Sequence, residues 1–337
     1  MASVAGARTA DSPTGAAVAQ LVIRNYEPEC AEAWDDLIGR SCNGTFLHTR
    51  RFITYHGDRF TDRSVILEDR RGRVKGVFPA AVSPASDEVI FSHPGLTYGG
   101  VVHDGTVRGA SMIEALQQIA EHYRLLGYRR LRYKAVPAIY HSVPAEDDLY
   151  ALFRLGGRRY RSDLSATVDL TRRGKPTHGR MSSRKTAEAA AVCTEDNWDA
   201  VTEFWAILET NLAQRHGASP VHSLREIRLL HDRFPDEIHL IVARTGGLLA
   251  GGALVFAAGP ALHLQYTATT PEGRAACVTD PLIERAVEFA AERGLQYFDF
   301  GTSTVEEGRS LDEGLYKFKL SFGAGSVVYD QYELDLE

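Results

Sequence analysis

The chain has 337 residues, of which 44% are hydrophobic, so it is long enough to form two domains or one large one. Its net charge of -6 excludes a broadly basic protein and an extended duplex DNA partner, although it leaves room for a local basic patch. The four cysteines lack CxxC spacing, which argues against a disulfide framework or a metal site and favours reduced thiols in a cytoplasmic protein, and no apolar run approaches the roughly 20 residues of a membrane span.

The first half of the chain predicts one mixed α/β unit after an N-terminal tail. Residues 1–18, rich in Ala, Gly, Ser and Thr, are predicted to be disordered. The unit predicted over residues 19–170 comprises a strand at 21–26, a helix at 30–39, a hairpin at 64–83, a strand and Gly-rich loop at 88–103, a helix at 112–126 and a strand at 130–136. Gly127 stands where a helix C-terminal glycine belongs.

The second half, residues 191–337, predicts the same plan. Two helices are expected at 198–217 and 223–234, and a hairpin at 238–257. A strand at 261–270, a helix from Asp280 to Gly294, a strand at 296–301 and a last strand at 326–336 follow.

A repeat supports this division. Residues 149–170, LYALFRLGGRRYRSDLSATVDL, align without gaps with residues 315–336, LYKFKLSFGAGSVVYDQYELDL, at an offset of 166 and with five identities. The match lies in the same register as the preceding helix and strand. We therefore predict an α/β (α+β) fold of two tandem units, each a mixed, mostly antiparallel sheet flanked by helices, joined by a basic linker at 171–190.

The two copies differ at one informative position, where Phe153 in the first copy corresponds to Lys319 in the second. If both copies were only scaffold, similar apolar residues would serve both. A lysine here predicts a positive charge beside a cleft in the second unit. The alternative is a solvated lysine at a strand end.

The linker carries a concentration of positive charge. Residues 154–185 hold ten basic residues against two acidic ones, a local net charge of +8. A basic, mobile segment between two units predicts a phosphate or RNA contact, and a solvated linker is the alternative. The residues expected to make the contact are Arg158, Arg159, Arg161, Arg180, Arg184 and Lys185.

Two further loops hold candidate groups. Residues 270–275, TPEGRA, follow a strand and precede a helix, so the backbone at Gly273 and the side chain of Arg274 are candidate phosphate contacts, with an ordinary turn as the alternative. His93 and Tyr98 share a Gly-rich loop that is expected to line a cleft. No HExxH, nucleophile elbow or P-loop is present.

The segments FDFGTS (298–303) and LYKFKLSFG (315–323) resemble the end of the Fem-like branch of the GNAT acyltransferase superfamily. In that family a Phe-Lys-x-x-Phe-Gly pattern closes the second of two GNAT-like units. Phe318, Lys319, Phe322 and Gly323 match it residue by residue. Residues 43–60, 92–100 and 263–273 are similar to bacterial GNAT-family acyltransferases, and the likeness covers residues 21–337.

The resemblance implies acyl transfer to an amine, with two possible donors. Ordinary GNAT enzymes cradle the pyrophosphate of acyl-CoA on a Gln/Arg-x-x-Gly-x-Gly/Ala loop; Gly273 and Ala275 fit this pattern, but Thr270 departs from it. Fem-like enzymes use aminoacyl-tRNA, and their motif lysine lies beside the acyl end of the donor. No coiled-coil arm of the kind that Fem enzymes often carry is evident here.

The expected function is therefore transfer of an aminoacyl group from aminoacyl-tRNA to an amine of a small molecule or cell-envelope precursor. Acetyl-CoA is the alternative donor, and a non-catalytic RNA- or nucleotide-binding module is the second alternative. The resemblance implies tRNA as a transient partner, no tightly bound cofactor and a cytoplasmic location.

The same resemblance assigns roles. Lys319 is expected to neutralise the developing oxyanion, and Asp299 or a histidine such as His222 to accept the proton. Tyr266 and Tyr316 are candidates to donate a proton to the leaving group. The other expected substrate contacts are Phe318, Gln265, Tyr98, His93, Arg215 and Ser303.

Overall fold

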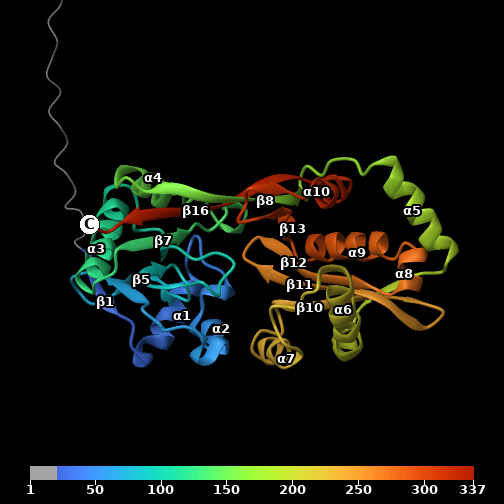
Figure 1. Ribbon diagram of the computed structural model, residues 1–337, viewed down its shortest axis with the longest axis horizontal. Helices are drawn as coiled ribbons and strands as arrows, with labels where there is room; N and C mark the ends of the chain where they lie inside the picture. The colour runs from blue at the N-terminus through green and yellow to red at the C-terminus, as the bar shows by residue number, and fades with distance from the viewer. Residues whose placement is uncertain (1–20) are drawn as a thin grey trace, which may run out of the picture.

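The computed structural model describes residues 21–337, so the tail predicted at 1–18 lies outside the described residues. Two α/β units lie side by side, and two long strands, β8 (Arg158–Asp169) and β16 (Gly325–Asp335), run across both units at the top of the view (Figure 1). Mixed α/β architecture with helices flanking a mostly antiparallel sheet is confirmed.

Unit one follows the predicted order of elements. It contains strands β1 (Val22–Asn25), β2 (Val65–Glu68), β3 (Val74–Phe78), β4 (Ala81–Ser83), β5 (Ser86–Phe91), β6 (Val102–His103), β7 (Arg130–Lys134) and β8 (Arg158–Asp169), and helices α1 (Ala31–Gly39), α2 (Arg50–Ile53), α3 (Ala110–Leu125) and α4 (Asp147–Arg154). Gly127 follows α3 with a φ of 91°, a conformation that favours glycine, as predicted.

Unit two repeats the plan with additional helices. It contains strands β9 (Cys193–Asp196), β10 (Ile238–Thr245), β11 (Leu248–Ala258), β12 (Ala261–Thr269), β13 (Tyr297–Thr302), β14 (Thr304–Val305), β15 (Ser310–Leu311) and β16 (Gly325–Asp335), and helices α5 (His178–Ala189), α6 (Val201–His216), α7 (Leu224–Arg233), α8 (Pro271–Ala275), α9 (Thr279–Glu292) and α10 (Glu313–Leu320).

The two units exchange their final strands. The large sheet runs β4-β5-β7-β16-β8-β13-β12-β11-β10-β9, so β16 from unit two pairs with β7 of unit one, and β8 from unit one pairs with β13 of unit two. The β8–β16 register pairs Asp163 with Tyr329, the same two residues that the sequence offset of 166 makes equivalent. A local two-fold axis therefore passes between these residues.

Each unit also contains a pair of parallel strands that separate. In unit one, β5 and β7 pair only from Val89 to Phe91, and in unit two β12 and β13 pair only from Ala261 to His263. The helix between the strands of each pair covers one face of the sheet: α3 buries Met112 and Leu116, and α9 buries the equivalent stripe in unit two. The two pairs of parallel strands thus separate after the same number of paired residues in each unit.

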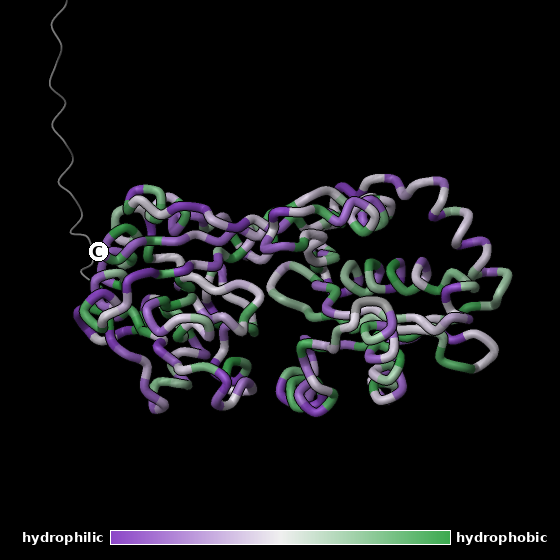
Figure 2. The backbone as a smooth tube through the Cα atoms, in the orientation of Figure 1, coloured by the Kyte–Doolittle hydropathy of each residue, from purple (hydrophilic) through white to green (hydrophobic). Residues whose placement is uncertain are grey.

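Apolar residues concentrate where the sheet meets the helices, whereas the exposed turns are mostly polar (Figure 2). The core of unit one includes Leu334 and Leu336 from the end of the chain, which are 5% and 4% exposed. Unit one therefore depends on residues that the sequence places in unit two.

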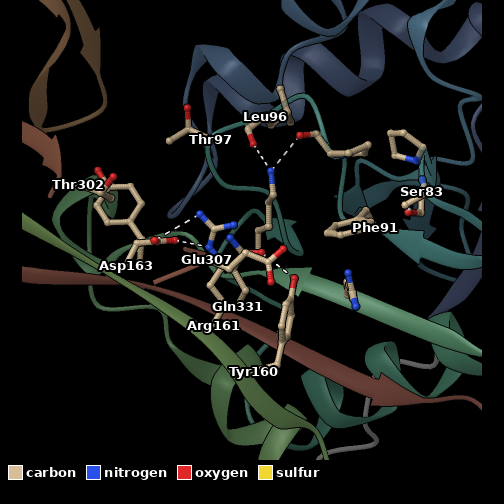
Figure 3. Close-up of a pocket in the computed structure, with 16 residues that line it drawn as sticks. Ser83, Phe91, Leu96, Thr97, Tyr160, Arg161, Asp163, Thr302, Glu307 and Gln331 are labelled. Atoms are coloured by element: carbon tan, nitrogen blue, oxygen red, sulfur yellow. Dashed lines mark hydrogen bonds and ion pairs between the residues drawn. The ribbon is translucent and has the colours of Figure 1, made fainter. Parts of the chain in front are cut away.

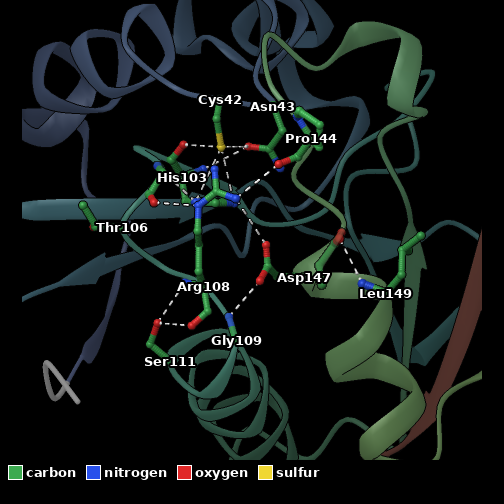
Figure 4. A network of polar contacts seen from close by, with 12 residues as sticks. Cys42, Asn43, His103, Thr106, Arg108, Gly109, Ser111, Pro144, Asp147 and Leu149 are labelled. Atoms are coloured by element: carbon green, nitrogen blue, oxygen red, sulfur yellow. Dashed lines mark hydrogen bonds and ion pairs between the residues drawn. The ribbon is translucent and has the colours of Figure 1, made fainter. Parts of the chain in front are cut away.

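A buried polar network joins loops at the base of α3 (Figure 4). The thiol of Cys42 lies 3.5 Å from Nε2 of His103, and Arg108 contacts Asp147 at 3.7 Å. Burial raises the pKa of Cys42, so this thiol is protonated and unreactive at neutral pH. The Asp147 carboxylate accepts a hydrogen bond from the N–H of Gly109 at the start of α3, so the network has a structural role.

Two predicted local structures differ from the observed ones. Residues 315–320, expected near a strand end, are helical in α10, because Asp312 caps the helix by accepting a hydrogen bond from the N–H of Leu315. The linker expected at 171–190 contains helix α5, which packs against α9.

The strand exchange makes a prediction about stability. Leu334→Ala removes side-chain volume from the core of unit one and is expected to lower the free energy of unfolding by about 2–4 kcal/mol. Val328→Ala, on the same strand but 45% exposed, is the matched control and is expected to cost less than about 0.5 kcal/mol. Chemical denaturation measures both, and equal effects would contradict a structural role for β16 in unit one.

Candidate active site

Lys319 is held inside the molecule by backbone carbonyl groups. Its Nζ donates to the carbonyl oxygens of Gly301 at 2.8 Å and Thr302 at 2.7 Å, and the residue is 7% exposed. Burial lowers the pKa of Lys319 to about 8, partly opposed by the negative charge of Asp299. Lys317, two residues earlier, is exposed and pairs with Glu313. The structure thus separates the two lysines of the motif into one buried and one solvated ammonium.

A bulge in β13 presents these carbonyl groups. The β13–β8 register shifts between Asp299 and Thr302, and Gly301 lies within the shift with a φ of 73°. Glycine adopts this conformation without strain. A Cβ at this position would also lie 3.3 Å from Cε1 of His263, which is closer than a normal contact.

Asp299 is at the centre of a buried hydrogen-bond network. Its Oδ1 accepts from the hydroxyls of Ser165 at 2.6 Å and Thr167 at 2.8 Å. Its Oδ2 accepts from the hydroxyls of Tyr140 at 2.9 Å and Tyr329 at 2.6 Å. The Asp299 residue is fully buried, with none of its surface exposed.

The fifth partner of this carboxylate is His263, whose Nδ1 lies 2.8 Å from Oδ2 of Asp299. Burial alone would raise the pKa of Asp299, but its hydrogen bonds, first among them that from His263, hold it well below its usual range. Asp299 is therefore ionised and enclosed by protein. The expectation that Asp299 itself takes a proton from the substrate does not fit this geometry, because its oxygens contact other side chains and not a cavity.

A cavity of about 310 Å³ lies at the end of β12, where α6, α8, α9 and α10 meet, and is called here the donor cavity. It is lined by Leu208, Asn211, Leu212, Thr267, Ala268, Thr269, Arg274, Thr279 and Phe318. Two predicted site residues, Arg274 and Phe318, therefore reach one cavity from different elements.

A second cavity of about 510 Å³ lies between the units and is called here the acceptor cavity (Figure 3). Its walls come from the loop between β3 and β5, from the loop after β5, and from β7, β8, β13 and β16. Arg161 donates to Asp163 at 2.6 Å, and Nζ of Lys134 donates to the carbonyl oxygens of Pro94 and Leu96. Burial lowers the pKa of Lys134 to about 8. The cavity thus combines basic, acidic and aromatic side chains.

Lys319 is linked to both cavities through its neighbours. Thr302, whose carbonyl oxygen accepts from Nζ of Lys319, lines the acceptor cavity, and Phe318, the preceding residue, lines the donor cavity.

Residues 177–319 match the family model described as an acetyltransferase (GNAT) domain. Among solved structures, FemX matches with a TM-score of 0.67 at 12% identity, over 93% of this chain and 97% of that chain. L-PGS from Bacillus licheniformis matches with a TM-score of 0.60 at 13% identity, over 91% of both chains. The C-terminal domain of a putative lysylphosphatidylglycerol synthetase from Agrobacterium fabrum has a TM-score of 0.56 at 12% identity, over 92% of both chains. No curated protein sequence matches the chain.

The chain has the fold of FemX, and unit two contains the region that matches the GNAT domain model. The resemblance to the Fem-like branch is confirmed at the level of the fold. Among residues 21–337, none of the helices combines the length and the apolar character that a membrane span requires. The same residues contain no group of His, Cys, Asp and Glu side chains that is arranged to hold a metal ion.

The loop expected to bind phosphate is closed by its own hydrogen bonds. Residues 271–275 form helix α8, and the N–H of Gly273 donates to Oγ1 of Thr270 at 2.9 Å. A Cβ at Gly273 would lie 2.1 Å from the carbonyl oxygen of Ala250, so packing against β11 explains this glycine. Arg274 donates to the carbonyl oxygen of Thr269 at 2.8 Å.

The N-terminus of α9 already holds a carboxylate. Asp280 lies in its first turn, is 2% exposed, and accepts from Arg180 at 3.0 Å. Burial raises the pKa of Asp280 to about 6, opposed by Arg180 and Arg184. An anionic ligand at this helix end would be close to the charge of Asp280.

Ion pairs neutralise much of the basic segment at residues 154–185. Six of its ten basic residues form ion pairs: Arg158 with Glu333 and Asp335, Arg159 with Asp330, Arg161 with Asp163, Arg173 and Arg184 with Glu284, and Arg180 with Asp280. The net charge of +8 expected for this segment therefore does not form one basic surface patch. Lys185 is exposed on α5, and no ion pair involving it is found in the part of the chain that the structure describes.

The predicted histidines lie at the junction of the units and not in either cavity. His93 packs against His56 with ring centroids 5.1 Å apart, and Nδ1 of His222 lies 2.8 Å from the hydroxyl of Tyr266. Tyr55 stacks on His222 and links the two pairs. These side chains form an aromatic line from unit one to unit two.

The remaining predicted residues are scattered. Tyr98 is 1% exposed and packs on Tyr140, so it belongs to the core and does not line a cleft. Ser303 is 2% exposed, with a buried hydroxyl that has no partner among the described residues. Tyr316 and Gln265 are half-buried, and the side chain of Arg215 lies outside the described residues.

Sequence reasoning missed His263, Ser165, Thr167, Tyr140 and Tyr329. The alternation of Ser165 and Thr167 within a strand was the available signal, because it predicts two hydroxyls on one face. Their common partner lies more than 130 residues away, so the register between β8 and β13 was needed to see the cluster.

Buried histidines predict acid sensitivity of the fold. Burial lowers the pKa of His48 and His222 to about 4 and that of His93 to about 3. As pH falls below about 6.5, these histidines bind protons in the unfolded chain before they do so in the folded protein. The free energy of unfolding therefore decreases progressively from there toward pH 4. The melting temperature is expected to fall between pH 7.5 and pH 5.5.

The variant His93→Asn is the matched control, because asparagine tolerates the φ of 62° found at this position and cannot titrate. The fall in melting temperature should be smaller in this variant. Burial also raises the pKa of Asp148 and Asp280 to about 6, which opposes the trend, so the difference between the two proteins isolates the histidine. Identical pH dependence would contradict the assignment to His93.

Proposed function

We propose that the protein transfers an aminoacyl group from aminoacyl-tRNA to the amine of a small molecule or cell-envelope precursor. The buried ammonium of Lys319 supports this above all, because it bonds to Thr302 at the acceptor cavity and follows Phe318 at the donor cavity. The enzyme would act in the cytoplasm with charged tRNA as a transient partner and without a tightly bound cofactor.

The reaction needs an amine, an ester carbonyl and a positive charge at one point. As the amine attacks the carbonyl carbon, negative charge develops on the carbonyl oxygen. An ammonium has three N–H donors, and Lys319 directs two of them to Gly301 and Thr302. The third remains for the oxyanion. A pKa of about 8 keeps most of this group protonated near pH 7.

The donor end of unit two favours aminoacyl-tRNA over acyl-CoA. A pyrophosphate needs free backbone N–H groups and an unoccupied helix N-terminus. Here the N–H groups of Gly273, Arg274, Ala276 and Val278 bond within the protein, and Asp280 occupies the start of α9. Asn211, Arg274 and Phe318 instead offer an amide, a guanidinium and an aromatic ring, which suit a nucleoside and its phosphodiester.

The acceptor cavity suits a molecule with both charges. Lys134 and Arg161 can bind an acidic group, whereas Asp163 and Glu307 can orient an ammonium. Acetyl-CoA remains the second candidate donor, because the family model that matches residues 177–319 is an acetyltransferase domain.

The first functional prediction concerns the lysine. Lys319→Met removes the buried charge and is expected to lower the rate of transfer about 10²–10³-fold. Transfer is measured with radiolabelled, charged tRNA and a low-molecular-mass metabolite extract as the source of amines. Lys317→Met is the matched control, because that side chain is solvated on the same helix, and its rate should not change. A fully active Lys319→Met enzyme that remains folded by circular dichroism would refute the role.

The second functional prediction concerns the donor. In a coupled reaction with amino acids, synthetases and total tRNA, ribonuclease should abolish transfer, and acetyl-CoA should not replace the charged tRNA. Transfer that resists ribonuclease and proceeds with acetyl-CoA would reverse the choice of donor. No transfer with either donor would favour a binding module over an enzyme.

A further inference from the structure

The end of the paired region between β12 and β13 carries a histidine and a carboxylate in direct contact. His263 pairs with Asp299 in the last parallel rung before the strands separate. The Nδ1–Oδ2 distance of 2.8 Å means that Nδ1 donates to the carboxylate, which leaves Nε2 as the basic nitrogen. The carboxylate of Asp299 is itself held rigidly, and it therefore fixes the tautomer of the His263 imidazole.

The basic nitrogen is accessible. The His263 side chain is 15% exposed, and no hydrogen bond to its Nε2 is found in the described part of the chain. Because Nε2 has no hydrogen-bond partner and is not a buried atom, it reaches solvent. Four other donors hold the carboxylate in place, and the imidazole therefore has an open side and an anchored side.

The same imidazole lies beside the bulge of β13 that holds Lys319. Its Cε1 lies 3.3 Å from the position of a Cβ on Gly301, and the carbonyl of Gly301 accepts from Lys319. His263 and Lys319 thus approach the bulge of β13 from two elements. One side supplies a base and the other a cation, which are the two groups that acyl transfer to an amine requires.

Unit one lacks this arrangement at the equivalent rung. There, β5 and β7 end their parallel pairing with Phe91 opposite Arg132. The Arg132 guanidinium lies 5.5 Å from the Phe91 ring centroid and also pairs with Glu333. The imidazole and carboxylate are therefore a property of the unit that also contains Lys319, and not of the repeated fold.

We propose that His263 is the proton acceptor for the attacking amine and that Asp299 is its positioning residue. This inference rests on the proposed acyl transfer. The amine nitrogen forms a bond to the ester carbonyl carbon, and its proton passes to Nε2 of His263. When the carbon–oxygen ester bond breaks, the imidazolium returns that proton to the departing ribose oxygen, so that an amide and a free tRNA hydroxyl result. The carboxylate of Asp299 stabilises the imidazolium in between.

The test uses the full-length His263→Ala enzyme in single-turnover transfer from charged tRNA to amines of the metabolite extract. The rate is expected to fall about 10²–10⁴-fold, while the Kd for charged tRNA changes less than about twofold. Free imidazole should restore part of the lost rate, because the cavity left by the side chain opens to solvent. A merely structural histidine would not respond to imidazole.

His239→Ala is the matched control, since His239 has a 10% exposed side chain on β10 of the same sheet and bonds to the Asp236 carbonyl. It should retain the wild-type rate and show no effect of imidazole. A wild-type rate in His263→Ala would overturn the inference and leave the proposed function standing. A loss of rate without rescue, accompanied by loss of tRNA binding, would also overturn it and assign His263 a structural role. A wild-type enzyme that is inactive with charged tRNA would instead overturn the proposed function.

Discussion

The buried charge of Asp299 constrains both units of the molecule. A carboxylate removed from water is several kcal/mol less stable unless hydrogen bonds replace its hydration. Here the replacements come from far-separated parts of the chain: Tyr140 in unit one, Ser165 and Thr167 on β8, His263 on β12 and Tyr329 on β16. Because every donor depends on the same acceptor, the units cannot shift relative to each other without leaving this charge unpaired.

The exchanged strands make that convergence possible. β8 and β16 cross at the local two-fold axis, so each unit lends the other a strand that carries polar side chains to the centre. The backbones of the two units are related by symmetry, whereas the side chains at equivalent positions differ in their chemistry. At matching positions unit one has Phe91, Arg132 and Phe153, where unit two has His263, Asp299 and Lys319. The fold is therefore shared by both units, whereas the reactive groups belong to one.

Much of this organisation was accessible from the sequence, because it follows from local periodicity and from the repeat. The offset of 166 predicted two units and singled out Lys319, and it also relates the ends of α4 and α10. What remained hidden depends on strand register. The partners of Arg158 and Arg173 are Glu333 and Glu284, more than 100 residues away, so a local count of charge overstated the basic patch. Likewise, Asp299 looked like a free base until its five donors were placed.

The central position of β16 has a consequence for how the protein is made. During synthesis on the ribosome, β7 and β8 emerge long before residues 325–335, which later separate them in the sheet. Until then both strands expose unpaired backbone edges, and the core of unit one lacks Leu334 and Leu336. Both halves are thus expected to complete their folding only after residues 325–335 have emerged, and chaperones that protect open strand edges would be needed until then.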